Sequence, residues 1–417
     1  MKFSFLTHIF GIENNKFSKF IYIFGLPFEV NSKVIFKWIY KYLPVEDKKI
    51  VISNYSGNTY GCNPKYITDE IIRRKLPYKL VWLVKNPKIE AESGNFPPEV
   101  KLVNYYSLKA LKELATSKIW IATIRKICFF KAGLIKKRNQ IYINTWHGSL
   151  GIKKLDADAP NFLNRVNWDG YEKKDSESLD YLLSNSQFEN DLFKRNFDEH
   201  GEIKQFGHPR NDIFFSDSTV INEKIRNVLG LNKDVHICLY APSYRDDGRI
   251  YCFGIEYEEL LETLTEKFGG KWVVLVRLHP NFRQYQKRVI PQRENIYNVS
   301  EYPDIQELLV ASDIAITDYS SCIFDFMLSR KPGFIYATDI KEFDEDRGFY
   351  YPLTSTPFPV AKNNDELRKN ILEFDYKSYR KKVEEFLQEK GCMEDGHASE
   401  RAVDLIEEIM NEGINEK

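Results

Sequence analysis

Short apolar segments alternate with amphipathic segments along almost the whole chain, and this alternation restricts the fold more than any other feature. Strand-like runs such as Lys49–Ser53, Lys79–Val84 and Ile119–Ala122 are separated by stretches with helical spacing. Strands that alternate with helices in this way form βαβ units and a parallel sheet. The pattern restarts at His236–Ala241 and continues through Trp272–Leu278. We therefore predict an α/β protein with two doubly wound sheets that face each other.

The length of the chain agrees with two domains. At 417 residues it exceeds one ordinary core, and its 43% hydrophobic and 29% charged composition is that of a globular protein. We expect residues 46–212 to form the first domain and residues 213–388 the second. Gly207–Asp212 would be the connector between them. Residues 389–417 would form a C-terminal helix.

Residues 1–45 precede the first strand and are expected to form a helical appendage. The segment from Phe3 to Phe28 is apolar and aromatic, but Glu13, Lys16 and Lys19 interrupt it. A membrane span needs roughly 18 uncharged residues, and a signal peptide needs an apolar core followed by small residues. The segment has neither. It would lie against a membrane surface or pack on the first domain, and the sequence leaves both possibilities open.

The charge distribution excludes some partners. Lys plus Arg and Asp plus Glu each number 60, so the net charge is zero, and with no reader module in the sequence we expect no nucleic-acid binding. From Lys118 to Lys154, however, there are nine basic residues and no acidic one. This run suits an anionic membrane surface, although a solvated face is the more common outcome for a charge run. The six cysteines form no CxxC pair, which indicates neither a zinc site nor a disulfide scaffold, so we expect a reducing cytoplasm and no metal.

Two histidines directly follow strand-like runs. His147 comes after Ile141–Ile143, and His279 comes after Trp272–Leu278. The carboxyl ends of parallel strands are where α/β proteins bind ligands, and imidazole exchanges protons near neutral pH. His147 is followed by a glycine and could act as general base on a hydroxyl group. The alternative is an imidazole whose nitrogens are satisfied within the turn.

The second half carries three further candidate motifs. Alternation along the strand is expected to place Arg277 and His279 on the same side of the strand, and this pair suits an anionic ligand. Arg277 could equally be paired with a carboxylate. In Pro242–Arg245, a proline and an aromatic ring would form a wall for a base or sugar. Ser320 and Ser321 stand between a buried strand and a helix, where N–H groups and hydroxyls bind anions.

Serines before a helix are also ordinary N-caps, and we favour the phosphate site over a plain cap. The sequence contains neither GxxxxGK[ST] nor GxGxxG, so a P-loop and the usual dinucleotide fingerprint do not fit. A phosphate site here would rely on serines and backbone N–H groups.

Together and in this order, the motifs resemble the CDP-glycerol glycerophosphotransferase family, the teichoic-acid and capsule polymerases and primases. That family has a GT-B-like fold of two facing Rossmann-like domains. The resemblance runs from about Lys48 to the tail and rests on an ordered set of segments: Asn54–Gly57, Asn63–Tyr66, Thr145–Gly148, Gly207–Asp212, Tyr240–Pro242, Arg245–Asp247, Arg277–Pro280, Thr317–Ser321, Arg347–Tyr350 and Glu394–Arg401.

The resemblance implies a role for each candidate residue. His147 would activate the acceptor hydroxyl, with Gly148, Ser149 and Lys153 on the acceptor side. The donor pyrophosphate would be held by four residues of the second half: His279, Arg277, Ser320 and Ser321. The nucleotide would lie near the loop containing Pro242, Ser243 and Arg245. The implied reaction is in-line attack by a polymer-end hydroxyl on the β-phosphorus of CDP-glycerol, with release of CMP.

The resemblance also implies a lipid-linked glycan or teichoic-type acceptor at the cytoplasmic face of the membrane, and no cofactor. Ser149-Leu150 stand where family members often carry Thr-Pro, which leaves the acceptor more open than the donor. The alternatives are a CDP-ribitol or sugar transferase on the same scaffold, and a nucleotide- or glycan-binding module without catalysis.

Overall fold

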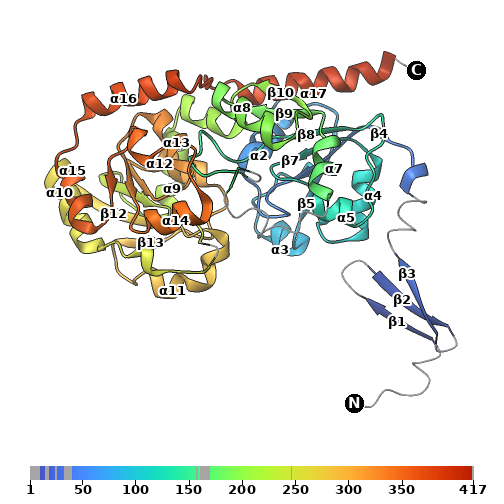
Figure 1. Cartoon of the computed structure of the whole chain (residues 1–417), viewed down its shortest axis with the longest axis horizontal. Helices are drawn as coiled ribbons and strands as arrows, with labels where there is room; N and C mark the ends of the chain where they lie inside the picture. The colour runs from blue at the N-terminus through green and yellow to red at the C-terminus, as the bar shows by residue number, and fades with distance from the viewer. Residues whose placement is uncertain are drawn as a thin grey trace.

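In the computed structural model, two parallel β-sheets lie side by side along the long axis of the molecule (Figure 1). The structure describes residues 10–14, 18–23, 26–31, 40–155, 158–159, 170–245 and 247–415. The predicted α/β class with two doubly wound sheets is confirmed.

The first sheet has seven strands in the order β10-β9-β8-β7-β4-β5-β6, and every neighbouring pair is parallel. Its strands are β4 (Glu46–Ser53), β5 (Lys79–Val84), β6 (Val100–Asn104), β7 (Ser117–Ala122), β8 (Ile141–Asn144), β9 (Tyr181–Ser184) and β10 (Glu202–Gln205). The helices between them are α2 (Cys62–Arg73), α3 (Pro87–Glu92), α4 (Leu108–Thr116), α5 (Ile127–Lys131), α7 (Tyr171–Glu177) and α8 (Gln187–Asn196).

The second sheet has six parallel strands in the order β13-β12-β11-β14-β15-β16. Its strands are β11 (Val235–Tyr240), β12 (Lys271–Val276), β13 (Ile296–Asn298), β14 (Ile314–Thr317), β15 (Gly333–Tyr336) and β16 (Val360–Ala361). Its α-helices are α9 (Thr219–Leu229), α10 (Tyr257–Phe268), α11 (Gln286–Val289), α12 (Ile305–Ala311), α13 (Cys322–Phe326), α14 (Ile340–Arg347) and α15 (Asn364–Leu372). Short 3-10 segments are η4 (Tyr251–Phe253), η5 (Pro280–Tyr285), η6 (Met327–Ser329) and η7 (Leu353–Ser355).

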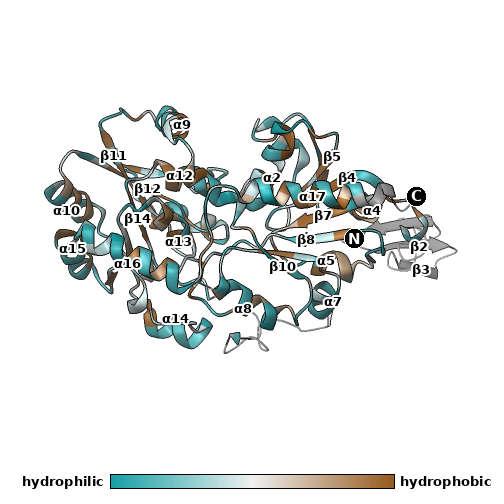
Figure 2. Ribbon diagram, turned by 90° about the horizontal axis from the view of Figure 1, so that it is seen from above, coloured by the Kyte–Doolittle hydropathy of each residue, from teal (hydrophilic) through white to brown (hydrophobic). Residues whose placement is uncertain are grey.

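Both sheets are buried on two faces, which explains why their strands are continuous apolar runs rather than alternating ones. Successive side chains of a strand point to opposite faces, so Val51 belongs to one core cluster of the first half and Ile50 and Ile52 to another. Helices cover both faces, and Figure 2 shows the brown strands enclosed by helices whose outer surfaces are teal.

Both sheets have the strand order of a doubly wound fold, which reverses direction between the first strand and the fourth. That reversal lies between β4 and β7 in the first half and between β11 and β14 in the second. Ligands of open α/β sheets bind outside the carboxyl ends of the strands at this position. The loops that follow these four strands are therefore the first place to look for a site.

Two connections join the halves. The first is the 3-10 segment η3 (Pro209–Phe215), which contains most of the predicted connector. The second is the pair α16 (Tyr376–Glu389) and α17 (Ala398–Asn415), which returns the chain from the second half to the first (Figure 1). The apolar residues Val403 and Ile406 of α17 are completely buried in a core cluster of the first half. The C-terminal helix is thus part of the first half's core.

The expectation of a helical appendage over residues 1–45 is wrong for the described residues within 10–31, whereas residues 40–42 are helical. Residues 10–31 contain three antiparallel strands, β1 (Phe10–Asn14), β2 (Ser18–Ile23) and β3 (Leu26–Asn31). Aromatic and β-branched residues at alternate positions favour strands. Residues 1–9 and 32–39 lie outside the described part. Among the described residues, no helix combines the length and the apolar character that a membrane crossing requires.

Candidate functional site

The sequence-predicted residues all follow the carboxyl ends of strands. His147 follows β8, Pro242–Arg245 follows β11, Arg277 and His279 follow β12, and Ser320–Ser321 follows β14. The loops after β11 and β14 flank the strand-order reversal of the second sheet. The predicted residues therefore lie at the carboxyl edge of the sheets, where α/β proteins bind ligands.

His147 has one ring nitrogen committed to the protein. Its Nδ1 lies 2.9 Å from the carbonyl oxygen of Thr123, in the loop after β7. Because a carbonyl only accepts hydrogen bonds, Nδ1 carries the proton and Nε2 is the basic nitrogen. The rings of Tyr55 and Trp146 pack against the imidazole at centroid distances of 5.3 and 4.6 Å. The ring is therefore fixed in orientation and tautomer.

The surroundings of His147 keep it neutral. Burial lowers its pKa to about 4, and the positive charges of Arg210 and Lys153 act in the same direction. The hydrogen bond to the Thr123 carbonyl opposes this effect in part. At neutral pH the imidazole is consequently in the form that accepts a proton.

The backbone around His147 is strained and tightly held. Trp146 and Leu150 have positive φ angles of 54° and 44°, which non-glycine residues rarely adopt. The Nδ2 group of Asn63 donates to the carbonyl oxygens of Thr145 and Trp146, at 2.8 and 3.2 Å. Strained backbone of this kind persists where the surrounding structure enforces it, which is common at functional sites.

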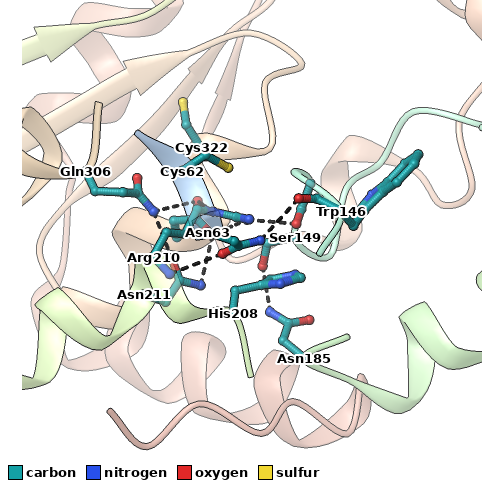
Figure 3. A network of polar contacts seen from close by, with 12 residues as sticks. Cys62, Asn63, Trp146, Ser149, Asn185, His208, Arg210, Asn211, Gln306 and Cys322 are labelled. Carbon is teal, nitrogen blue, oxygen red and sulfur yellow. Dashed lines mark hydrogen bonds and ion pairs between the residues drawn. The ribbon is translucent and has the colours of Figure 1, made fainter. Parts of the chain in front are cut away.

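Arg210 connects the His147 loop to the second half (Figure 3). It lies in η3, and its NH2 group donates to the carbonyl oxygen of Gly148 at 2.7 Å. Its Nε and NH2 groups also bind the carboxylate of Asp325 in α13, at 2.9 and 3.1 Å. Its backbone N–H donates to the side chain of Asn63. One buried arginine thus joins the His147 loop to the helix that begins after Ser320–Ser321.

A second carboxylate, on the half-buried Glu394, extends this network. Glu394 accepts hydrogen bonds from Asn185 at 2.9 Å and from Asn211 at 2.8 Å. Burial raises its pKa to about 8. Asn185 also donates to the hydroxyl of Ser149, which is buried. The structure therefore places Ser149, predicted on the acceptor side, in an internal network between the halves.

The loop after His147 touches the predicted phosphate-binding turn. A Cβ on Gly151 would lie 3.7 Å from the Cβ of Ser321, and one on Gly148 would lie 4.0 Å from its hydroxyl. The hydroxyl of Ser320 accepts a hydrogen bond from the backbone N–H of Cys322 at 3.4 Å, while Ser321 is the N-cap of α13 and makes no side-chain cap hydrogen bond. The structure thus brings Gly148 and Gly151 close to Ser321.

Arg245 is buried and engaged by two carboxylates. Its Nε and NH2 groups bind Asp339 at 2.8 and 2.9 Å, and NH2 lies 2.8 Å from Asp318. Asp318 in turn accepts from the backbone N–H of Ser243 at 2.8 Å. Pro242 is buried as well. These residues shape the loop after β11, and a direct nucleotide contact of Arg245 remains a prediction.

Arg277 and His279 follow the end of β12. Strand β12 ends at Val276, so the alternation we expected to align the two side chains does not extend to them. Arg277 donates to the carbonyl oxygens of Val299 and Tyr302, at 3.1 and 2.6 Å. His279 is exposed, and its ring lies 5.5 Å from that of Tyr244.

Several functional candidates carried no predicted role. Thr123 and Asp325 have no distinctive sequence context, and their importance depends on contacts with distant residues. Arg210 and Glu394 belong to two of the segments behind the family resemblance, which was the available signal.

The basic run from Lys118 to Lys154 is largely tied into the protein. Lys126 is buried, with its Nζ 3.0 Å from the hydroxyl of Ser53, and Lys137 donates to two backbone carbonyls. Of the nine basic residues, only Arg138 is exposed. All six cysteines are free thiols.

Comparison with known proteins gives a consistent picture. The sequence profile of the family described as CDP-Glycerol:Poly(glycerophosphate) glycerophosphotransferase matches residues 35–408. A teichoic acid poly(glycerol phosphate) polymerase of Bacillus spizizenii is 30% identical over 379 residues, which are 87% of this chain and 93% of that protein. A teichoic acid glycerol-phosphate transferase of Staphylococcus aureus is 29% identical over 374 residues, covering 86% and 92%. The chain spans about half the length of two longer polymerases, of Staphylococcus epidermidis and Bacillus subtilis (52% and 49%).

The fold is shared with a solved structure of related sequence. A histidine-to-asparagine variant of the wall teichoic acid polymerase TagF, soaked with CDPG, superposes with a TM-score of 0.78 at 28% identity. The match covers 92% of this chain and 94% of that one.

Proposed function

Since the chain belongs to the CDP-glycerol:poly(glycerophosphate) glycerophosphotransferase family, we propose that it transfers glycerol phosphate from CDP-glycerol to a hydroxyl of a lipid-linked, teichoic-type polymer and releases CMP. The observation that carries this proposal is the state of His147. Its Nδ1 is bound to a carbonyl, its low pKa keeps it neutral, and its loop contacts the serine turn of the other half.

In the proposed reaction, the acceptor oxygen forms a bond to the β-phosphorus of the donor. The bond between this phosphorus and the oxygen that bridges to the CMP phosphorus breaks, and CMP leaves with that oxygen. The proton of the acceptor hydroxyl moves to Nε2 of His147. Phosphoryl transfer requires little covalent chemistry from the protein. Most of the rate gain therefore comes from positioning the substrates and stabilising charge.

The donor side of the site is assigned to the second half. Ser320 and Ser321 would bind the donor phosphates, together with Arg277 and His279. The loop of Pro242, Ser243 and Arg245 would shape the nucleotide position. The strand-order reversal between β11 and β14 supports this assignment, since both loops leave the sheet there.

The donor identity is tested by incubating the protein and a lipid-linked acceptor with CDP-glycerol, CDP-ribitol or a UDP-sugar. We expect CMP release and a longer polymer with CDP-glycerol, detected by mass spectrometry of the product. Release of CMP only from CDP-ribitol would contradict glycerol-phosphate transfer and would indicate a ribitol-phosphate transferase. Transfer only from a UDP-sugar would contradict phosphotransfer.

The proposed location is the cytoplasmic face of the cell membrane, where a lipid-linked acceptor is found. Because most of the basic run is engaged internally, we do not assign membrane attachment to that run. Co-sedimentation with vesicles that contain the lipid-linked acceptor, compared with vesicles that lack it, tests whether the acceptor itself recruits the protein. Equal sedimentation with both would contradict recruitment by the acceptor.

A further inference from the structure

A bound diphosphate needs cationic donors, and most cations at the strand ends are already occupied. Arg245 is held by Asp318 and Asp339, and Arg210 is held by Asp325. Arg277 donates to two backbone carbonyls. Lys153 differs from these three, because its ammonium makes no hydrogen bond or ion pair with any residue that the structure describes.

Lys153 belongs to the first half in the sequence, but its backbone is paired with the second half. Its backbone forms an antiparallel bridge with Phe349. On either side of it, Tyr350 donates from its backbone N–H to the carbonyl of Ile152 at 2.8 Å, and Lys154 donates to the carbonyl of Gly348 at 3.1 Å. Ile152 is also part of the core cluster of the second half. The position of Lys153 is therefore set by the donor-side domain.

The surroundings of Lys153 favour an anion. The charged groups that act on it are Asp318, Arg347 and Arg245, and the thiol of Cys322 lies nearby. Asp318 is itself bound to Arg245 and to Ser243, so it is not available as a dedicated partner. The remaining charges are positive. Lys153 is half-buried, and a charge interaction there is stronger than in bulk water.

We propose that Lys153 binds the diphosphate of the donor, together with Ser320 and Ser321, and that the donor site is complete only when the loop following His147 is paired with residues 348–350. This role rests on the proposed function and replaces the acceptor-side position that the resemblance implied for Lys153. A lysine ammonium is a compact point charge with three donors, which suits phosphate oxygens. Donor binding would thereby fix the loop that carries the catalytic base.

The proposal has a pH signature. Burial lowers the pKa of Lys153 to about 8, with Arg347 and Arg245 contributing and Asp318 opposing. Only the protonated amine binds the diphosphate strongly, so the affinity for CDP should decrease as the pH rises from 7 to 9. In Lys153→Arg the guanidinium stays charged over this range, and the decrease should disappear.

The experiment measures the affinities of CDP-glycerol, CDP and cytidine by calorimetry for the full chain and for Lys153→Ala. Lys154→Ala is the matched control, since it removes a neighbouring charge of the same loop. We expect Lys153→Ala to weaken CDP and CDP-glycerol binding by about 10- to 100-fold, the usual effect of a charge-assisted hydrogen bond. Cytidine binding and the Lys154→Ala variant should be unchanged.

Three results would overturn the role of Lys153. The first is an unchanged CDP affinity in Lys153→Ala. The second is an equal loss of CDP affinity and cytidine affinity in this variant. The third is a raised KM for the acceptor while the donor affinity of the variant is unchanged. Absence of CDP and CDP-glycerol binding to the unmodified protein would instead contradict the proposed function, and this role with it. The Lys153→Arg variant gives a separate check if Lys153→Ala does not fold.

Discussion

The pH dependence of catalysis follows from the environment of His147. Its pKa is lowered to about 4, chiefly by burial, so the imidazole is unprotonated throughout the neutral range. We expect kcat/KM to stay constant between pH 7 and 6, below the range in which Lys153 loses its proton. It should fall only as the pH approaches 4, where the base becomes protonated. Measured rates that halve near pH 6.5, the ordinary value for histidine, would contradict this environment.

Arg210 should affect catalysis without touching the substrate. Its NH2 group holds the Gly148 carbonyl while its guanidinium binds Asp325. Arg210→Lys keeps the charge but cannot make both contacts, so we expect kcat to fall about 10- to 100-fold with little change in donor affinity. Steady-state kinetics with calorimetry of CDP-glycerol measures both quantities.

Arg401→Lys is a matched control. Arg401 lies in α17 and donates to the backbone carbonyl of Phe206 and to the carboxylate of Asp395. It should leave kcat unchanged. An unaltered kcat in Arg210→Lys, or an equal loss in both variants, would contradict a positioning role for Arg210.

At the scale of elements, Glu394 makes the contact between the halves sensitive to pH. The folded protein holds the Glu394 proton up to a pKa of about 8, whereas an unfolded glutamate loses its proton near pH 4.5. Between these values the folded state binds more protons, so this group stabilises the protein less as the pH rises. Glu394→Gln resembles the protonated form and should remove this contribution.

We expect the thermal midpoint of the unmodified protein to decrease by several degrees relative to that of Glu394→Gln between pH 5 and 8.5. Differential scanning calorimetry of both proteins in matched buffers measures the difference. If the thermal midpoints of the two proteins change in parallel with pH over this whole range, Glu394 is ionised in the folded protein.

The elements of the two sheets were largely predictable, because a strand buried on both faces is a continuous apolar run. The predicted strand Lys79–Val84 matches β5 residue for residue, and the predicted strand Ile119–Ala122 lies within β7. The strands of residues 10–31 were predicted as helix, since a mixed apolar and charged segment does not by itself distinguish the two periods.

The contacts that assemble the site could not be predicted in the same way. Pairing of Lys153 with Phe349 and of Arg210 with Asp325 joins residues far apart in the chain. Nothing in the local sequence of Lys153 indicates that Ile152 packs in the second core. The sequence therefore identified the strand-end residues and left open which of them lie together.

At the scale of the whole molecule, the two halves are held by more than one connection. Besides η3 and the α16–α17 return, Tyr66 of α2 donates to Asp304 at 2.9 Å, and Tyr351 donates to the carbonyl of Leu150. The second of these contacts holds the loop that follows His147 against the second half. The arrangement fits an enzyme that must present one substrate to the other in a defined geometry.

The central claim is that this chain is a phosphotransferase in which His147 is the base. The most direct test compares CMP release from CDP-glycerol, in the presence of a lipid-linked acceptor, for the unmodified protein and His147→Ala. CDP-glycerol affinity is measured in parallel. We predict that the variant loses about 100- to 10,000-fold in turnover and binds CDP-glycerol with unchanged affinity. Undiminished CMP release by His147→Ala would contradict the account.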